Sequence, residues 1–149
     1  MVKVYIKKLD PAVTLPEYKT DGASGMDLKA FTEKIINLKP KTSALVPTGL
    51  SVAFPKDYEI QIRPRSGLAV KNNISVLNTP GTIDSDYRGE IKIILYNHGD
   101  IDFNINNGDR VAQMILSPVI KMELKETKNL PETIRGEGGF GSTGKWIQS

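Results

Sequence analysis

The stretch Tyr58-Glu59-Ile60-Gln61-Ile62-Arg63 alternates cleanly between outward polar and inward apolar positions. A period of two is the pattern of a β-strand that buries one face. Similar short runs recur along the chain, about ten residues apart and separated by turn residues. They are Val2–Ile6, Lys34–Leu38, Ala44–Val46, Leu50–Phe54, Ile91–Tyr96, Ile101–Ile105, Val111–Leu116 and Val119–Leu124. This regular spacing predicts an all-β sandwich, jelly roll or barrel.

The domain organisation is simple. With 149 residues the chain suits one compact domain, and it shows no linker or internal repeat. One short helix is expected at residues 66–71, where Ser66 can act as the N-cap and Pro64 keeps the preceding segment extended. From about Lys125 the apolar period fails. We therefore predict a single domain over residues 1–149 that is all-β, as a jelly-roll-like β-barrel or sandwich. Residues 125–149 are expected to form a mobile, glycine-rich C-terminal arm.

Composition narrows the chemistry. The chain has no cysteine and one histidine, His98, in a turn-like segment where a surface position is expected. Thiolate–zinc sites, cysteine nucleophiles and two-histidine metal sites are thereby excluded. Any catalytic metal should be a hard cation bound through oxygen, with Mg²⁺ the obvious candidate, and any general base should be a carboxylate.

The charge distribution favours a small anionic ligand. Twenty Lys and Arg residues are scattered among 17 Asp and Glu, for a net charge of +3, without the basic stripe typical of nucleic-acid proteins. The first eight residues alternate and lack the apolar core of a signal peptide, and no apolar run is long enough to cross a membrane. A cytoplasmic protein with no membrane or nucleic-acid partner is expected.

The tail Arg135–Gly144 holds five glycines in ten residues, together with one aromatic residue. Its composition is typical of a disordered terminus. Glycines also let backbone N–H groups approach an anion, Ser142 and Thr143 add hydroxyls, and Phe140 offers a face to stack on a base. A mobile clamp for phosphate and base is the functional alternative.

A second candidate is Arg63-Pro64-Arg65-Ser66-Gly67, at the end of the alternating strand. The two arginines should project to the same side, and guanidinium groups bind phosphate in a bidentate manner. The free N–H groups of a helix start add to such an anion site. A pair of surface arginines beside an ordinary helix cap is the alternative.

A third candidate, Thr79–Glu90, places Asp84, Asp86 and Tyr87 between turn residues. Aspartates in turns commonly bond the local backbone, whereas one of these two could activate a water molecule. Tyr87 would then offer an aromatic face to a sugar.

Two further side chains stand inside apolar strand patterns. Asp27, in Asp21–Ala30, is either paired structurally or orients metal-bound water. Gln113, in Gly108–Ile115, needs a hydrogen-bond partner, which is either backbone or ligand.

In order and spacing, these five segments resemble the five motifs of the homotrimeric dUTPase family, from about Asp21 to Gly144. The resemblance implies a β jelly roll that assembles as a trimer with three active sites at subunit interfaces. It also implies Mg²⁺-dependent hydrolysis of dUTP to dUMP and pyrophosphate, which limits uracil in DNA and supplies dUMP for dTMP synthesis.

The same resemblance implies the role of each residue. Asp84 matches the carboxylate that deprotonates the attacking water, and Tyr87 the ring that packs under the deoxyribose. Asp27 matches a position linked to Mg²⁺ through water. The remaining matches are the uracil-reading hairpin from about Asn78 to Ile91, with Gly81 and Ile83; the phosphate contacts Arg65, Ser66, Gly67 and Gln113; and the tail residues Arg135, Phe140, Gly141, Ser142 and Thr143. Lys92 departs from the expected apolar or small residue, and its side chain is expected to point to solvent.

Two alternatives stay open. One is an enzyme like the related dCTP deaminase, which shares the fold but reads differently in the third and fifth motifs. The other is a dUTPase-like regulatory or nucleic-acid-binding protein, suggested by the basic isoelectric point alone. Retention of Asp84 and an intact tail argues against the second.

Overall fold

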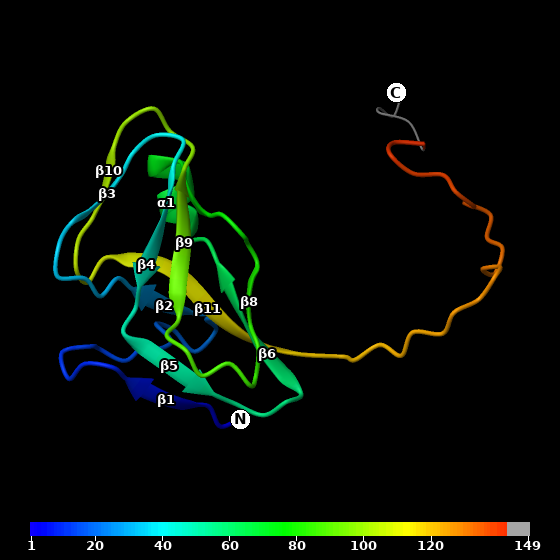
Figure 1. The fold of residues 1–149 in the computed structure, drawn as a ribbon, viewed down its shortest axis with the longest axis horizontal. Helices are drawn as coiled ribbons and strands as arrows, with labels where there is room; N and C mark the ends of the chain where they lie inside the picture. The colour runs from blue at the N-terminus through cyan, green and yellow to red at the C-terminus, as the bar shows by residue number, and fades with distance from the viewer. Residues whose placement is uncertain (143–149) are drawn as a thin grey trace.

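The computed structural model describes residues 1–142, in which eleven strands and one helix follow one another (Figure 1). The elements are β1 (Tyr5–Lys8), β2 (Met26–Lys29), β3 (Ile36–Leu38), β4 (Ser43–Pro47), β5 (Leu50–Ala53), β6 (Tyr58–Arg63), α1 (Ser66–Asn72), β7 (Ile74–Val76), β8 (Gly81–Ile83), β9 (Lys92–Asn97), β10 (Phe103–Ile105) and β11 (Arg110–Pro118). The predicted all-β class with one short helix is confirmed.

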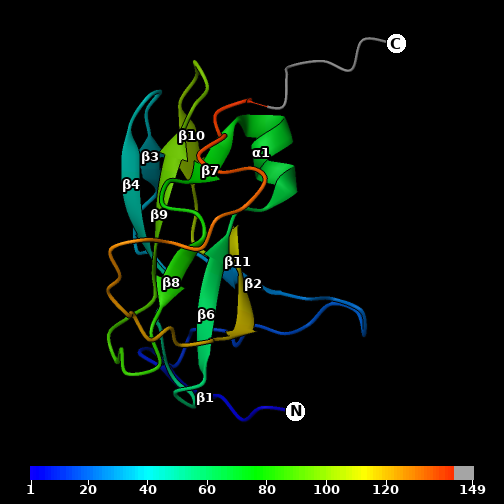
Figure 2. The same cartoon turned by 90° about the vertical axis from the view of Figure 1, so that its right-hand side faces the viewer.

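The strands form four antiparallel sheets. A four-stranded sheet has the order β2-β11-β6-β8, a three-stranded sheet has the order β4-β9-β7, and β1-β5 and β10-β3 form two-stranded pairs. Figure 2 shows the two larger sheets as separate layers. The sheets do not close into a barrel within the described residues, so the architecture is the jelly-roll-like sandwich rather than the barrel.

The core lies between these layers and follows the alternation of the sequence. In β6, Ile60 and Ile62 are each 3% exposed, whereas Gln61 between them is only partly buried. In β9, Ile93 and Leu95 face inward in the same way. One buried polar residue ties three segments together: the Asn97 amide donates to the carbonyls of Leu38 and Ile101.

The N-cap of the helix lies one residue earlier than the sequence predicts. Arg65 occupies the N-cap with an extended backbone, and no side chain caps the helix. Ser66 is therefore the first helical residue, and its expected capping role is wrong, because the extended residue before the helix is Arg65.

The expected hairpin between Asn78 and Ile91 is also different. β8 pairs with β6, while β9 pairs with β4 and β7. Residues 84–91 therefore bridge the two larger sheets instead of turning back within one sheet.

The chain leaves the body after β11. Val119 donates to the Asp57 carbonyl, and the residues beyond it run as an extended segment clear of the body (Figure 1). The strand expected at Val119–Leu124 is wrong, because this segment finds no strand partner among residues 1–142. Its apolar side chains Ile120, Met122 and Leu124 are 82–94% exposed. Across residues 1–142, no helix has the length and apolar character needed to span a membrane.

Candidate active site

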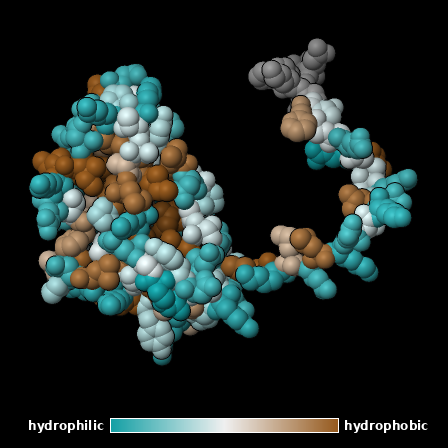
Figure 3. All heavy atoms as spheres, in the orientation of Figure 1, coloured by the Kyte–Doolittle hydropathy of each residue, from teal (hydrophilic) through white to brown (hydrophobic). Residues whose placement is uncertain are grey.

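Asp84 lies in a pocket formed where the bridging segment meets the outer face of the three-stranded sheet. The cavity has a volume of about 300 Å³. It is lined by Leu45, Thr82, Ile83, Asp84, Tyr87, Glu90, Lys92 and Ile94. Apolar side chains gather over β4 and β9 on this face (Figure 3). An exposed carboxylate thus lies beside an aromatic ring and an apolar floor.

Hydrogen bonds define the turn that carries Asp84 and Tyr87. The Tyr87 amide donates to the Asp84 carbonyl at 3.1 Å, and the Tyr87 hydroxyl donates to the Glu90 carbonyl at 3.0 Å. The Arg88 guanidinium donates to the carbonyls of Ser85 and Tyr87. Asp84 therefore serves both as a turn residue, through its backbone, and as an exposed carboxylate.

The far end of the bridging segment is anchored in the core. Ile91 is fully buried; its amide donates to the Leu50 carbonyl at 2.8 Å, and its carbonyl accepts from the Thr48 hydroxyl at 2.6 Å. The Gly49 amide donates to the Glu90 carboxylate at 2.9 Å. Both backbone groups of Ile91 are thus engaged inside the protein, and Ile91 anchors the end of the bridging segment.

Lys92 has an exposed side chain, as expected, but it also lies at the rim of the Asp84 pocket. Its ammonium group is 3.6 Å from the Glu90 carboxylate. The ion pair places a positive charge beside the carboxylate of Glu90 in the lining of the pocket.

A second cluster surrounds Asp27 on the four-stranded sheet. Its carboxylate accepts from Arg65 Nε at 2.8 Å and from an Arg110 guanidinium nitrogen at 3.2 Å. The pairing of Asp27 with Gln113, and of Gln113 with Arg63, places these side chains on one face of the sheet. The Gln113 amide donates to the Pro64 carbonyl at 2.9 Å. In this structure Asp27 is paired with two arginines and the Gln113 amide has a backbone partner.

Arg110 was missed by the sequence reasoning. It lies three residues before Gln113, within the candidate segment Gly108–Ile115. As an exposed charged residue at the start of a strand, it has no pattern that distinguishes it from other surface residues. Only the register of β2 beside β11 brings it to Asp27.

The start of α1 borders this cluster. Ser66 and Gly67 are exposed, and a Cβ atom built on Gly67 would meet nothing within 4 Å. The first amides of the helix are therefore accessible to an anion.

The tail residues form a compact local turn of their own. Arg135 Nε donates to the Gly138 carbonyl at 2.7 Å, and the Ser142 amide donates to the Gly139 carbonyl at 2.9 Å. The Phe140 side chain is fully exposed, and Gly141 has a φ of 88°. Thr143 lies outside the described residues. No hydrogen bond or ion pair within residues 1–142 joins this turn to Asp84 or to Arg65.

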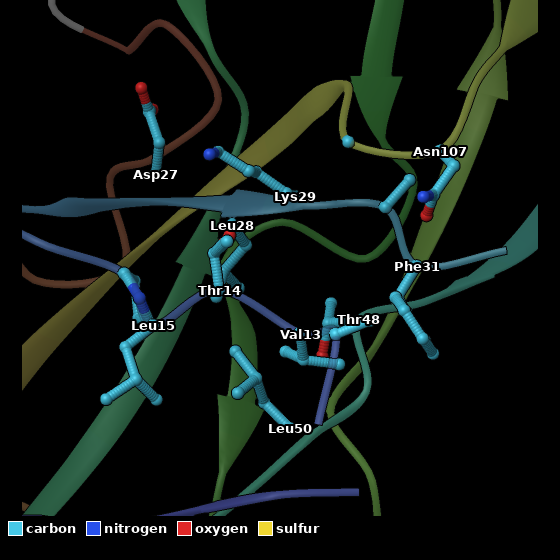
Figure 4. Close-up of a pocket in the computed structure, with 14 residues that line it drawn as sticks. Val13, Thr14, Leu15, Asp27, Leu28, Lys29, Phe31, Thr48, Leu50 and Asn107 are labelled. Atoms are coloured by element: carbon cyan, nitrogen blue, oxygen red, sulfur yellow. The ribbon is translucent and has the colours of Figure 1, made fainter. Parts of the chain in front are cut away.

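A further hollow lies beneath β2, next to residues 12–16. Figure 4 shows Leu28 pointing into it with Val13 and Leu50, whereas the Asp27 carboxylate points away. Asp27 is the one predicted site residue among the described lining residues, and because its carboxylate points away, the hollow does not open onto the arginine cluster.

An exposed carboxylate beside an aromatic ring, and two arginines around a second carboxylate, are the groups that a nucleotide hydrolase needs on a rigid β scaffold. The dUTPase family model matches residues 12–144. The chain belongs to the dUTPase family.

The chain is similar in sequence to individual relatives over nearly its full length. It is 53% identical over 148 residues to the deoxyuridine 5'-triphosphate nucleotidohydrolase of Rickettsia bellii (strain OSU 85-389), covering 99% of both chains. The protein of the same name from Clostridium tetani is 54% identical over 140 residues, covering 94% of this chain and 95% of that one. Among solved structures, a mutant of the Staphylococcus bacteriophage 80alpha dUTPase with dUpNHpp superposes with a TM-score of 0.86. That match covers 96% of this chain and 99% of the phage protein at 23% identity, and it supports the fold.

Proposed function

We propose that this chain hydrolyses dUTP to dUMP and pyrophosphate, and so limits uracil in DNA and supplies dUMP. The observation that carries the proposal is the shared pocket of Asp84 and Tyr87 in a member of the dUTPase family. Relatives with 53–54% identity carry the name deoxyuridine 5'-triphosphate nucleotidohydrolase.

Asp84 is the general base. Its carboxylate takes a proton from a water molecule, the water oxygen bonds to the α-phosphorus, and the bond to the bridging oxygen breaks so that pyrophosphate leaves. The exposure of Asp84 in the pocket supports this role, because a base must lie within hydrogen-bond reach of the water.

Tyr87 is the residue that packs under the deoxyribose. Its ring lines the same pocket as Asp84, and its hydroxyl is held by the Glu90 carbonyl. A fixed ring in this position leaves no space for a 2′-hydroxyl, which distinguishes dUTP from UTP by sterics.

Uracil is read by the main chain around β8, with Asn78, Gly81 and Ile83. β8 is an edge strand whose one described neighbour is β6. Its other edge therefore presents backbone N–H and C=O groups to a base. Backbone groups that pair with uracil are left unpaired beneath a bound cytosine, which can give discrimination of about 10⁴-fold.

The triphosphate is bound by Arg65, Ser66, Gly67 and Gln113, close to the open start of α1. Asp27 and Arg110 support this site, since Asp27 accepts from both arginine side chains. The tail residues Arg135, Phe140, Gly141, Ser142 and Thr143 close over the nucleotide, within the arm assigned to residues 125–149 of a single 1–149 domain.

Mg²⁺ is proposed as the cofactor, held mainly by the three phosphates. Among the described residues, no group of three His, Asp or Glu side chains could hold a metal ion. A single carboxylate such as Asp27 fits a contact through water, and Mg²⁺ commonly retains several waters beside substrate phosphates. The ion supplies charge neutralisation of the phosphates when bound.

We also propose a homotrimer with active sites at subunit interfaces. Within one chain, the Asp84 pocket, the arginine cluster and the tail turn are not joined by any hydrogen bond of the described residues. Leu45, Ile120, Met122 and Leu124 expose 57–94% of their surfaces. Association of copies would cover these apolar surfaces and bring the three groups together.

A substrate panel tests the proposed function. Purified protein with Mg²⁺ is incubated with dUTP, dCTP, dTTP and UTP, and the products are resolved by chromatography. Pyrophosphate and dUMP should form from dUTP at a rate far above that of the other three. Ammonia release from dCTP would instead indicate a deaminase. An absence of turnover with all four nucleotides would favour the alternative of a regulatory or nucleic-acid-binding protein.

A further inference from the structure

Gly89 lies directly against the ring of Tyr87. A Cβ atom built on Gly89 would be 2.3 Å from the Tyr87 hydroxyl oxygen, 2.5 Å from Cζ and 2.9 Å from Cε2. Real Cβ atoms do not approach other atoms this closely. The ring therefore occupies the space that any other residue at position 89 would fill.

The backbone of Gly89 does not itself require glycine. The positive-φ glycines of the described chain are Gly49, Gly108, Gly136 and Gly141. Gly89 is not among them, so its backbone conformation is open to other residues. The contact with Tyr87 is what excludes a side chain here.

The ring cannot move aside without losing the hydrogen bond of its hydroxyl group. At one end, the Tyr87 amide donates to the Asp84 carbonyl. At the other end, the Tyr87 hydroxyl donates to the carbonyl of Glu90. The Glu90 carboxylate is held in turn by the Gly49 amide, which belongs to the buried turn after β4. The backbone of Tyr87 is thus fixed by its amide and the ring by its hydroxyl, with Gly89 against the hydroxyl end.

We propose that Gly89 is a positioning residue that sets the place of the Tyr87 ring and thereby the selectivity for 2′-deoxy over ribonucleotides. This inference rests on the proposed function, in which Tyr87 packs under the deoxyribose. Steric exclusion of a hydroxyl group depends on the ring position to within a fraction of an ångström. We expect a methyl group at position 89 to displace the ring and break its hydroxyl contact, because the built Cβ lies 2.3 Å from the hydroxyl oxygen.

The test compares kcat/KM for dUTP and for UTP in the wild type and in Gly89→Ala. The ratio of the two values is expected to fall about tenfold or more, a size typical of lost pocket discrimination. Gly22→Ala is the matched control, since Gly22 also has no positive φ and a Cβ there meets nothing within 4 Å. Its selectivity ratio should equal that of the wild type.

A second measurement separates the ring contact from general damage. The urea unfolding midpoint of Gly89→Ala should fall relative to the wild type, whereas the same change in a Tyr87→Ala background should not lower the midpoint further. A general structural defect slows dUTP and UTP turnover by the same factor and lowers the midpoint in both backgrounds.

An unchanged dUTP-to-UTP ratio in folded Gly89→Ala, or equal midpoint losses in the two backgrounds, overturns the inference. Failure of the proposed function looks different, because the wild type itself would then release no pyrophosphate from dUTP.

Discussion

Asp27 and Arg65, which are 38 positions apart in the sequence, are joined by a hydrogen-bonded ion pair of 2.8 Å between Oδ1 and Nε. Both side chains are about one-fifth exposed. A carboxylate between Arg65 and Arg110 orients the first arginine and offsets one of the two positive charges, so the cluster keeps a net positive charge. The pair links a strand at the edge of the four-stranded sheet to the start of α1.

Asp27→Ala should weaken triphosphate binding, because Arg65 loses its fixed orientation. Removing a hydrogen bond to a charged group costs on the order of 1–3 kcal/mol. We expect KM for dUTP to rise and the urea midpoint to fall. Asp27→Asn keeps an acceptor for Arg65 and should retain more activity than Asp27→Ala. Equal kinetics of the wild type and Asp27→Ala would contradict the assigned role.

Asp84→Asn should abolish pyrophosphate release while the nucleotide still binds. The amide has nearly the same shape as the carboxylate but cannot accept the water proton. Isothermal titration with a non-hydrolysable dUTP analogue measures the binding, and product analysis measures the turnover. Asp86→Asn, in the same turn, is the control and should turn over normally. Full activity of Asp84→Asn would remove the proposed mechanism.

Thr48→Val should lower stability and turnover together. The Thr48 hydroxyl is 1% exposed and donates to the Ile91 carbonyl at the base of the bridging segment. Valine keeps the shape but leaves that carbonyl without its donor, a loss of about 1–3 kcal/mol in the free energy of unfolding. Urea denaturation gives the stability, and Thr14→Val, at a surface position, is the matched change. A stable Thr48→Val enzyme with unaltered kinetics would show that the anchor is unimportant.

Truncation after Ile134 should reduce turnover of dUTP far more than stability. The residues removed make no hydrogen bond to the body within the described chain, so the core is not affected. Circular dichroism on heating reports the stability, and steady-state kinetics report the turnover. A truncated protein that works at the full rate would contradict the closing role of the tail.

Removal of Mg²⁺ with a chelator should cut the rate of dUTP hydrolysis severely and leave the fold intact, since the described residues hold no metal cage. Excess Mg²⁺ should restore the rate. A rate that is indifferent to chelation would refute the metal role.

The sequence predicts the strands well where one face is buried throughout. β6 and β9 alternate over six residues each, and their inward side chains lie in the core as expected. The failures share a cause: pairing between distant segments is not visible in local alternation. Val119–Leu124 alternates as a strand does, but no partner strand covers it in the described chain. β8 and β9 look like a hairpin, but they join different sheets.

In the candidate site, too, contacts between residues close in sequence are predictable, whereas contacts between distant segments are not. Asp84 and Tyr87 are close in sequence, so local reasoning places them together, and the structure puts both in one pocket. Arg110 reaches Asp27 only through the register of β11 beside β2, which no local pattern reveals. The role of Gly89 depends on where one aromatic ring lies, and glycine in a turn carries no such signal.

The bridging segment 84–91 has a consequence for inactivation. One of its ends continues from the four-stranded sheet and the other enters the three-stranded sheet. The geometry around Asp84 therefore depends on how the two layers are packed, and it is lost when they separate. Catalytic activity on heating should consequently report cohesion between the layers, and it should disappear with the cooperative unfolding of the sandwich rather than through earlier melting of a loop.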